Sequence, residues 1–230
     1  MRKRVVSLPT KRCEECLELR PAIGFVSIGS GYKSLCSRCY NRMYMQRVGL
    51  PELETVDFEP LTRIDSWGVA HTFYFVVRLS IGLEISAFEW VHGAPGGYRF
   101  TVLEDPATPV REAYHALVAK IERGLMERYL VWSDFPGAGP DNTQVAGEAV
   151  NGRLEQRNGE PRVVVDGREY SWEQFGRFLR LHTGCHFRLE CYDPHDDPPI
   201  SAHPARPHPL WWLDLGFDEE RDTEEKLRSH

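Results

Sequence analysis

Residues 13–39, CEECLELRPAIGFVSIGSGYKSLCSRC, contain two Cys-x-x-Cys pairs, and they decide how the first part of the chain folds. A two-residue spacing lets both sulfurs of a pair point at one ion from a tight turn. Between the pairs, apolar runs flank residues 29–31, Gly-Ser-Gly, which predicts a β-hairpin that brings the pairs together. The spacing therefore favours one structural Zn2+ ion over four unconnected reduced cysteines. Its ligands would be Cys13, Cys16, Cys36 and Cys39.

The second cysteine pair opens a stretch of helical composition, residues 36–48, and Gly49 is well placed to end that helix. The positive end of the helix would face the thiolates. A cysteine knuckle, a hairpin and a ligand-bearing helix together make a treble clef, which we expect over residues 1–50. Because so short a segment has little core, metal coordination would supply most of its stability.

Two stretches of the chain resemble parts of known families. The Cys-x-x-Cys-Tyr-Asn-Arg sequence of residues 36–42 resembles the second half of small treble-clef zinc fingers at the front of assorted bacterial and phage proteins. Residues 163–193 are similar to a C-terminal module of uncharacterised bacterial proteins that carry such a finger. The resemblance implies a zinc finger followed by small α+β domains of unknown function, and it supplies no activity.

The first 48 residues are basic, although the whole chain carries a net charge of −6. They hold ten Lys or Arg and three Glu, a balance of +7, which leaves −13 for the rest of the chain. Zinc bound by four thiolates lowers the first balance to about +5, which still favours an anionic partner such as DNA or RNA. Phosphate contacts and base stacking are expected from Lys33, Arg38, Arg42, Arg47, Tyr40 and Tyr44, with Lys11, Arg12 and Tyr32 nearby. The alternative is a solvated basic surface, or one that binds protein.

A second unit of an α+β protein is expected at residues 63–135, after a linker at residues 51–62. Three strand-like stretches lie between His71 and Glu104, interrupted by turn-rich sequence at residues 93–97. An amphipathic helix at residues 108–130 would cover this antiparallel sheet.

A third unit, a β-β-α-β module, is expected at residues 144–193. Asp166-Gly167 suits a hairpin turn, and Ser171 opens a capping box. Residues 186–192 alternate between polar and apolar side chains, which predicts a last strand. Residues 194–230 are expected to be a Pro-rich, irregular tail. Its apolar segment around Trp211 and Trp212 is expected to dock on the chain's own sheet, with a partner protein as the alternative.

Weaker chemical signals lie near the end of the third unit. Ligand-type side chains at His182, Cys185, Cys191 and His195 would make a second metal site, but Cys191 shares a strand face with Phe187 and is better explained as a buried thiol. Adjacent Cys185 and His186 are a poor nucleophile and base, because catalytic partners are matched in space. No phosphate loop or hydrolase motif occurs, so enzyme activity is not expected.

The whole sequence thus predicts a zinc-binding, non-catalytic accessory protein. It would bind nucleic acid through its basic first unit and protein through its body. The alternatives are an adaptor that binds only protein, and an enzyme that uses the Cys185 region. With no apolar run near the ~20 residues that span a bilayer, and no signal-peptide core, we expect a cytoplasmic protein without a membrane partner.

Overall fold

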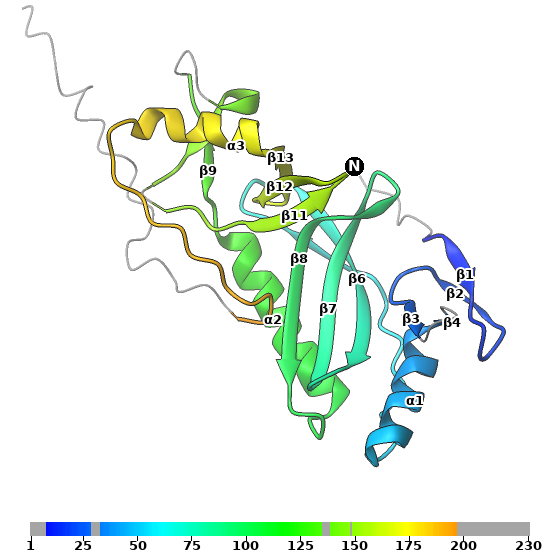
Figure 1. Cartoon of the computed structure of the whole chain (residues 1–230). Helices are drawn as coiled ribbons and strands as arrows, with labels where there is room; N and C mark the ends of the chain where they lie inside the picture. Colours follow the sequence, from blue (N-terminus) through cyan, green and yellow to red (C-terminus); the bar gives the residue numbers. More distant parts are fainter. Residues whose placement is uncertain (1–7, 29–32, 135–138, 148, 197–230) are drawn as a thin grey trace, which may run out of the picture.

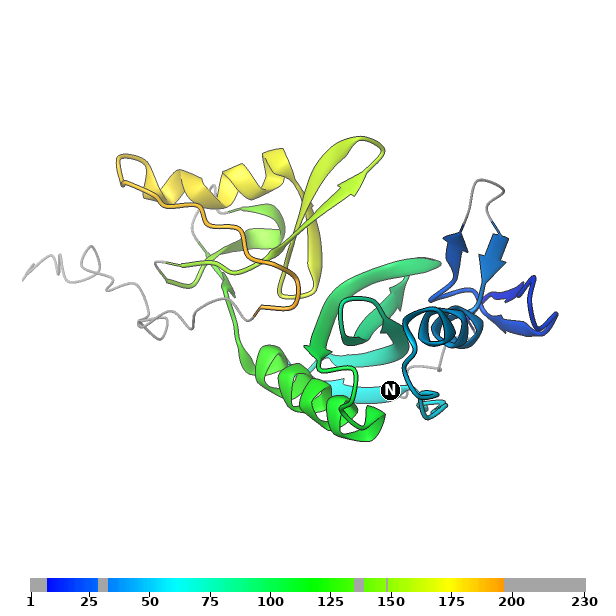
Figure 2. The ribbon, with the colours of Figure 1, turned by 60° about the horizontal axis from the view of Figure 1, so that its bottom comes forward.

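The computed structural model describes residues 8–28, 33–134, 139–147 and 149–196, and Figures 1 and 2 show their arrangement. The described residues form an α+β structure with only antiparallel strand pairs. A cysteine-bearing head and a third unit lie at opposite ends of a central sheet (Figure 2). None of the helices described is long and apolar enough to cross a bilayer.

The head consists of two short hairpins and one helix. Strands β1 (Thr10–Arg12) and β2 (Leu19–Pro21) pair, β3 (Val26–Ile28) pairs with β4 (Lys33–Leu35), and α1 spans Ser37–Val48. Gly49 ends the helix in the left-handed conformation, with φ of 72°, as predicted. The hairpin between the cysteine pairs is therefore confirmed by its strands, whereas its turn lies outside the described residues.

The central sheet has four strands in the order β5-β6-β7-β8, one more than predicted. They are β5 (Leu61–Ile64), β6 (Ala70–Leu79), β7 (Leu83–Val91) and β8 (Ala94–Glu104). The turn-rich sequence at residues 93–97 belongs mostly to β8, because His92 and Gly93 alone, both with positive φ, make the hairpin turn. A register shift between Phe88 and Glu89 leaves Gly97 and Tyr98 of β8 without a paired residue on β7, as at a β-bulge.

Helix α2 (Val110–Met126) covers one face of this sheet and is shorter than expected (Figure 1). Leu117, Ile121 and Leu125 of the helix pack on Phe73, Ile85 and other inward side chains of the strands, all fully buried. Alternation along each strand turns a mixed set of polar and apolar side chains to the opposite face, among them Arg78, Ser86 and Phe88.

The segment expected to be a linker packs against the sheet instead of bridging two independent units. Leu53, Val56 and Phe58 contact the central core, and the Phe58 ring stacks on Tyr114 with 4.1 Å between ring centroids. Strand β5 also begins at Leu61, inside the expected linker. The apolar side chains of Leu53, Val56 and Phe58 explain why this stretch packs on the core.

Helix α1 lies along β6 where β5 no longer pairs with it (Figure 1). The buried Asn41 amide donates to the carbonyl of Val77 at 3.1 Å and accepts from the N–H of Leu79 at 3.0 Å. The Tyr44 hydroxyl donates to the carbonyl of Ser80, and Met45 joins the central core. The head is therefore attached to the sheet by specific contacts.

The third unit combines a two-stranded and a three-stranded sheet with short helices. Its elements are β9 (Leu130–Trp132), η1 (Pro140–Asn142), β10 (Thr143–Val145), β11 (Arg153–Arg157), β12 (Glu160–Val165), β13 (Arg168–Ser171), α3 (Trp172–Phe178) and η2 (Leu179–His182). The Asp166-Gly167 turn and the capping box between Ser171 and Gln174 are confirmed.

The expected last strand at residues 186–192 is wrong. No strand pairs with this segment among the described residues, and Phe187 is 90% exposed. Alternation predicts a strand only where a partner strand supplies hydrogen bonds. The third strand of the module is instead β11, which precedes β12 through an Asn158-Gly159 turn, so the order is β-β-β-α.

Candidate metal centre

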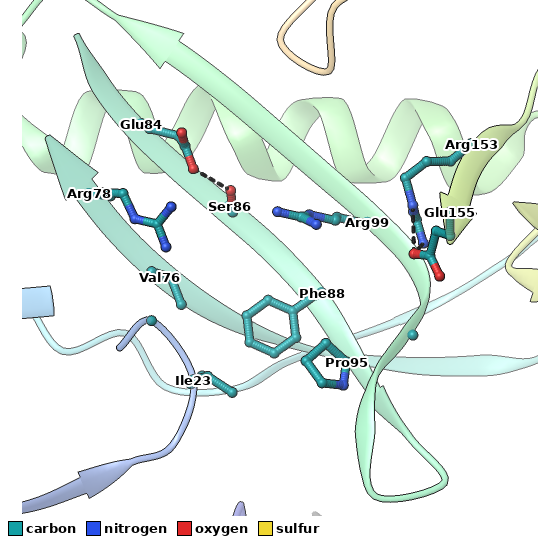
Figure 3. A pocket seen from close by; sticks show the side chains of 12 residues that line it. Ile23, Val76, Arg78, Glu84, Ser86, Phe88, Pro95, Arg99, Arg153 and Glu155 are labelled. Atoms are coloured by element: carbon teal, nitrogen blue, oxygen red, sulfur yellow. Dashed lines mark hydrogen bonds and ion pairs between the residues drawn. The ribbon is translucent and has the colours of Figure 1, made fainter. Parts of the chain in front are cut away.

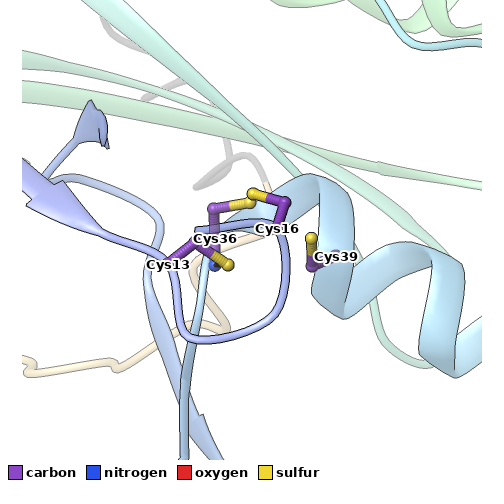
Figure 4. Close-up of side chains that lie close together, drawn as sticks. All are labelled: Cys13, Cys16, Cys36 and Cys39. Atoms are coloured by element: carbon purple, nitrogen blue, oxygen red, sulfur yellow. Dashed lines mark hydrogen bonds between the residues drawn. The ribbon is translucent and has the colours of Figure 1, made fainter. Parts of the chain in front are cut away.

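The four cysteines of the head converge on one point from two elements (Figure 4). Cys13 and Cys16 lie in the loop between β1 and β2, which the N–H of Leu17 closes by donating to the carbonyl of Cys13 at 3.0 Å. Cys36 is the residue before α1, and Cys39 lies in its first turn. All four sulfurs lie within 4.8 Å of one another, and none is in a disulfide.

Backbone N–H groups point at the first of these sulfurs. The Sγ atom of Cys13 accepts from the N–H of Cys36 at 3.3 Å and from that of Glu15 at 3.5 Å. Burial raises the pKa of Cys13, but the N–H groups that face it outweigh burial and lower the pKa to about 6. Burial raises the pKa values of Cys36 and Cys39, which also border the other thiols. The backbone thus stabilises the Cys13 thiolate, and a bound cation would offset the burial of Cys36 and Cys39.

The cluster fits a tetrahedral metal ion. A Zn2+ ion with Zn–S bonds of about 2.3 Å has its sulfurs about 3.8 Å apart. A contraction of about 1 Å from the observed spread therefore closes the site. Cys13, Cys36 and Cys39 are buried, Cys16 is half-buried, and Leu35 and Phe25 pack around them. The structure thus brings together four sulfurs that could hold one metal ion.

The second predicted cluster is not assembled. Cys185 and Cys191 are exposed, which also contradicts the buried thiol expected at Cys191. His195 contacts the Asp193 carboxylate, and its Nε2 atom lies 3.5 Å from Glu84. In the part of the chain that is described, His182 joins no metal-binding group, since only the four head cysteines form one.

The predicted nucleophile pair gains no support from its surroundings. Cys185 and His186 are both exposed, and the described contacts place no base on the Cys185 thiol. An exposed thiol without an activating neighbour is not arranged to act as a nucleophile.

The basic side chains of the head have different environments. Lys33 pairs with Glu15, and Arg38 pairs with Asp57, at the edge of the central unit. Arg42 and Arg47 are exposed on α1, and no ion pair is found for either among the described residues. A contact with nucleic acid was expected near Tyr32, and docking on the sheet or on a partner protein was expected of Trp211 and Trp212. All three residues lie outside the described residues.

The ring of Tyr40 lies 6.2 Å from that of Tyr44, whose hydroxyl donates to the carbonyl of Ser80, directly after β6. Lys11 lies over the Phe25 ring, and Arg12 is exposed. The aromatic side chains of α1 are therefore partly used in attaching the head to the sheet.

A buried ion-pair cluster escaped the sequence analysis. His71 on β6 lies between two carboxylates: its Nδ1 atom is 2.8 Å from Glu89, and its Nε2 atom is 3.0 Å from Asp65. Burial lowers the pKa of His71, but the hydrogen bonds and charges of Glu89 and Asp65 outweigh it and raise the pKa above its usual value. Both ring nitrogens are occupied, so the cluster is structural. A single histidine in a strand gives no signal of it.

Three family models match parts of the chain, and each describes a domain of unknown function. Residues 12–51 match DUF7685, residues 54–126 match DUF7686 and residues 137–196 match DUF7713. The first covers the head and the second covers the central sheet with α2. No curated protein and no solved structure matches the chain.

Proposed function

We propose that this chain is a non-catalytic binding protein whose head is a treble-clef domain built around one structural Zn2+ ion. The observation that carries this proposal is the group of four cysteine sulfurs within 4.8 Å. Sulfur ligands in this number suit zinc, and they leave no coordination position for a substrate. The knuckle at β1–β2, the hairpin β3–β4 and the helix α1 occur in the order of a treble clef.

Metal analysis of the full chain tests this assignment. We expect one zinc per chain, about one-tenth of that or less in Cys36→Ser, and full occupancy in the control Cys185→Ser, whose thiol is exposed. If wild-type protein bound a second equivalent of zinc and Cys185→Ser lost it, the predicted second metal site around Cys185 would be supported. Wild-type protein that remains folded and takes up no added zinc would refute the proposal.

The head's nucleic-acid surface, as we propose it, is centred on Arg42 and Arg47 rather than on all the basic residues. Both side chains are exposed on α1, whereas Arg38 and Lys33 have carboxylate partners. Phosphate contacts of this kind carry no base readout, so they should act on any sequence. The competing role is that of an adaptor that binds only protein.

A filter-binding titration of the full chain with single-stranded and duplex DNA separates these roles. Replacing Arg42 and Arg47 with Glu should weaken binding and reduce the slope of log K against log salt by about 2. Arg180→Glu, at an exposed position in η2, is the matched control. Absence of binding by wild-type protein at low salt would leave the adaptor role.

A further inference from the structure

The open face of the central sheet contains a cleft bordered by all three units (Figure 3). Its floor is formed by outward side chains of β6, β7 and β8. Ile23 and Gly24 of the head form one wall, and Arg153 and Glu155 of β11 form another. The cavity has a volume of about 200 Å3, below the roughly 300–1,000 Å3 of pockets for drug-sized ligands, so a ligand held within it would be small.

Three arginines line this cleft, and one of them is already neutralised. The Nη2 atom of Arg153 lies 2.6 Å from Glu155 and donates to the carbonyl of Gly97 at 2.9 Å. Arg78 and Arg99 have no ion-pair or hydrogen-bond partner for their guanidinium groups among the described residues. They extend toward each other from β6 and β8 on either side of Ser86 (Figure 3).

The carboxylate across the strand pair from Arg78 is bound by other groups. Glu84 lies directly across the β6–β7 pair from Arg78. Its carboxylate accepts from the Ser86 hydroxyl at 3.1 Å and lies 3.5 Å from the Nε2 atom of His195. The Nε atom of Arg78 is buried without a hydrogen bond. A buried cationic donor that the protein leaves unpaired is costly, so an anion from outside the described chain would satisfy it.

We propose that this cleft binds a small phosphate monoester, with its phosphoryl group between Arg78 and Arg99. A phosphoryl group carries three terminal oxygens and close to two negative charges, so it can accept from two guanidinium groups on separate strands. A carboxylate is satisfied by a single guanidinium fork. Ile23, Phe88 and Pro95 line the lower part of the cleft, so the esterified group is apolar or aromatic.

Calorimetric titration of the full chain with three probes tests the ligand class. We expect saturable binding of inorganic phosphate and tighter binding of phenyl phosphate, because the ring adds contact with Phe88. Benzoate, with the same ring and a carboxylate, should bind at least about tenfold more weakly than phenyl phosphate. Benzoate binding as tight as phenyl phosphate would overturn the phosphate assignment. Absence of binding by both phosphates at about 10 mM would overturn the site.

Two substitutions test whether the phosphoryl group binds between Arg78 and Arg99. Arg78→Met and Arg99→Met should each weaken phenyl phosphate binding about ten- to a hundredfold, because each removes charge-assisted hydrogen bonds. Arg99 is exposed, so its substitution tests the site without disturbing the core. Arg180→Met, outside the cleft, should bind like wild type. Equal affinity of the Arg99→Met variant and wild type would overturn the proposal.

Discussion

Replacing His71 with alanine removes the cation that separates two buried carboxylates. The side chains of Asp65 and Glu89 are 4% and 11% exposed, and each has one oxygen on a His71 nitrogen. Their remaining oxygens accept backbone N–H groups from Trp67, Val69 and Tyr98, so neither carboxylate can turn to solvent without breaking these bonds. The variant would hold two like charges in the same site.

The size of the effect follows from the burial of the cluster. Removing one partner of a buried ion pair costs about 3–5 kcal/mol, against about 0–1 kcal/mol for an exposed pair. For a chain of this length, the unfolding temperature should fall by about 6–20 °C. The matched control is His115→Ala, because His115 is exposed on α2 and should change stability by about 0.5 kcal/mol or less.

Urea unfolding at a series of pH values checks the electrostatic reasoning. The pKa of folded His71 is raised, so the stability it contributes is complete below the unfolded pKa of about 6.5. This contribution is lost as the pH rises through the folded pKa. The gap between wild type and His71→Ala should therefore narrow with increasing pH. A gap that is constant with pH, or no larger than that of His115→Ala, would refute the reasoning.

Three further predictions concern the head and the third unit. Cys36→Ser should remove amide protection from the head and from the end of β6 while β7 and α2 stay protected. Hydrogen exchange measures this protection. Loss of protection in all three units would mean that the chain unfolds as one cooperative unit. Asn41→Ala leaves two backbone groups of β6 unsatisfied and should cost about 2–4 kcal/mol in urea unfolding, whereas Gln46→Ala, exposed on the same helix, should cost little. Ser171→Ala removes the cap of α3 and should cost about 1 kcal/mol, an effect that Arg180→Ala, at an exposed position in η2, should not reproduce.

Local signals explain what the sequence analysis could predict. Cys-x-x-Cys spacing, the Asp166-Gly167 turn and the capping box at Ser171 act through neighbouring residues, so they were readable without the fold. The prediction of a strand at residues 186–192 was wrong because alternation says nothing about whether a partner strand is present. The clusters of His71 and of Arg78 depend on the register of separate strands, which no local pattern in this chain specifies.

The attachment of α1 to β6 has a consequence for how the protein would fail. Asn41 occupies the backbone groups of Val77 and Leu79 on the side of β6 that β5 does not reach. If the proposed metal were removed and the head detached, this stretch of β6 would become an open sheet edge, able to pair with a strand from another molecule. We therefore expect chelator-treated protein to self-associate in a concentration-dependent way. The proposed metal would then preserve solubility by protecting the edge of a strand that contains none of its ligands.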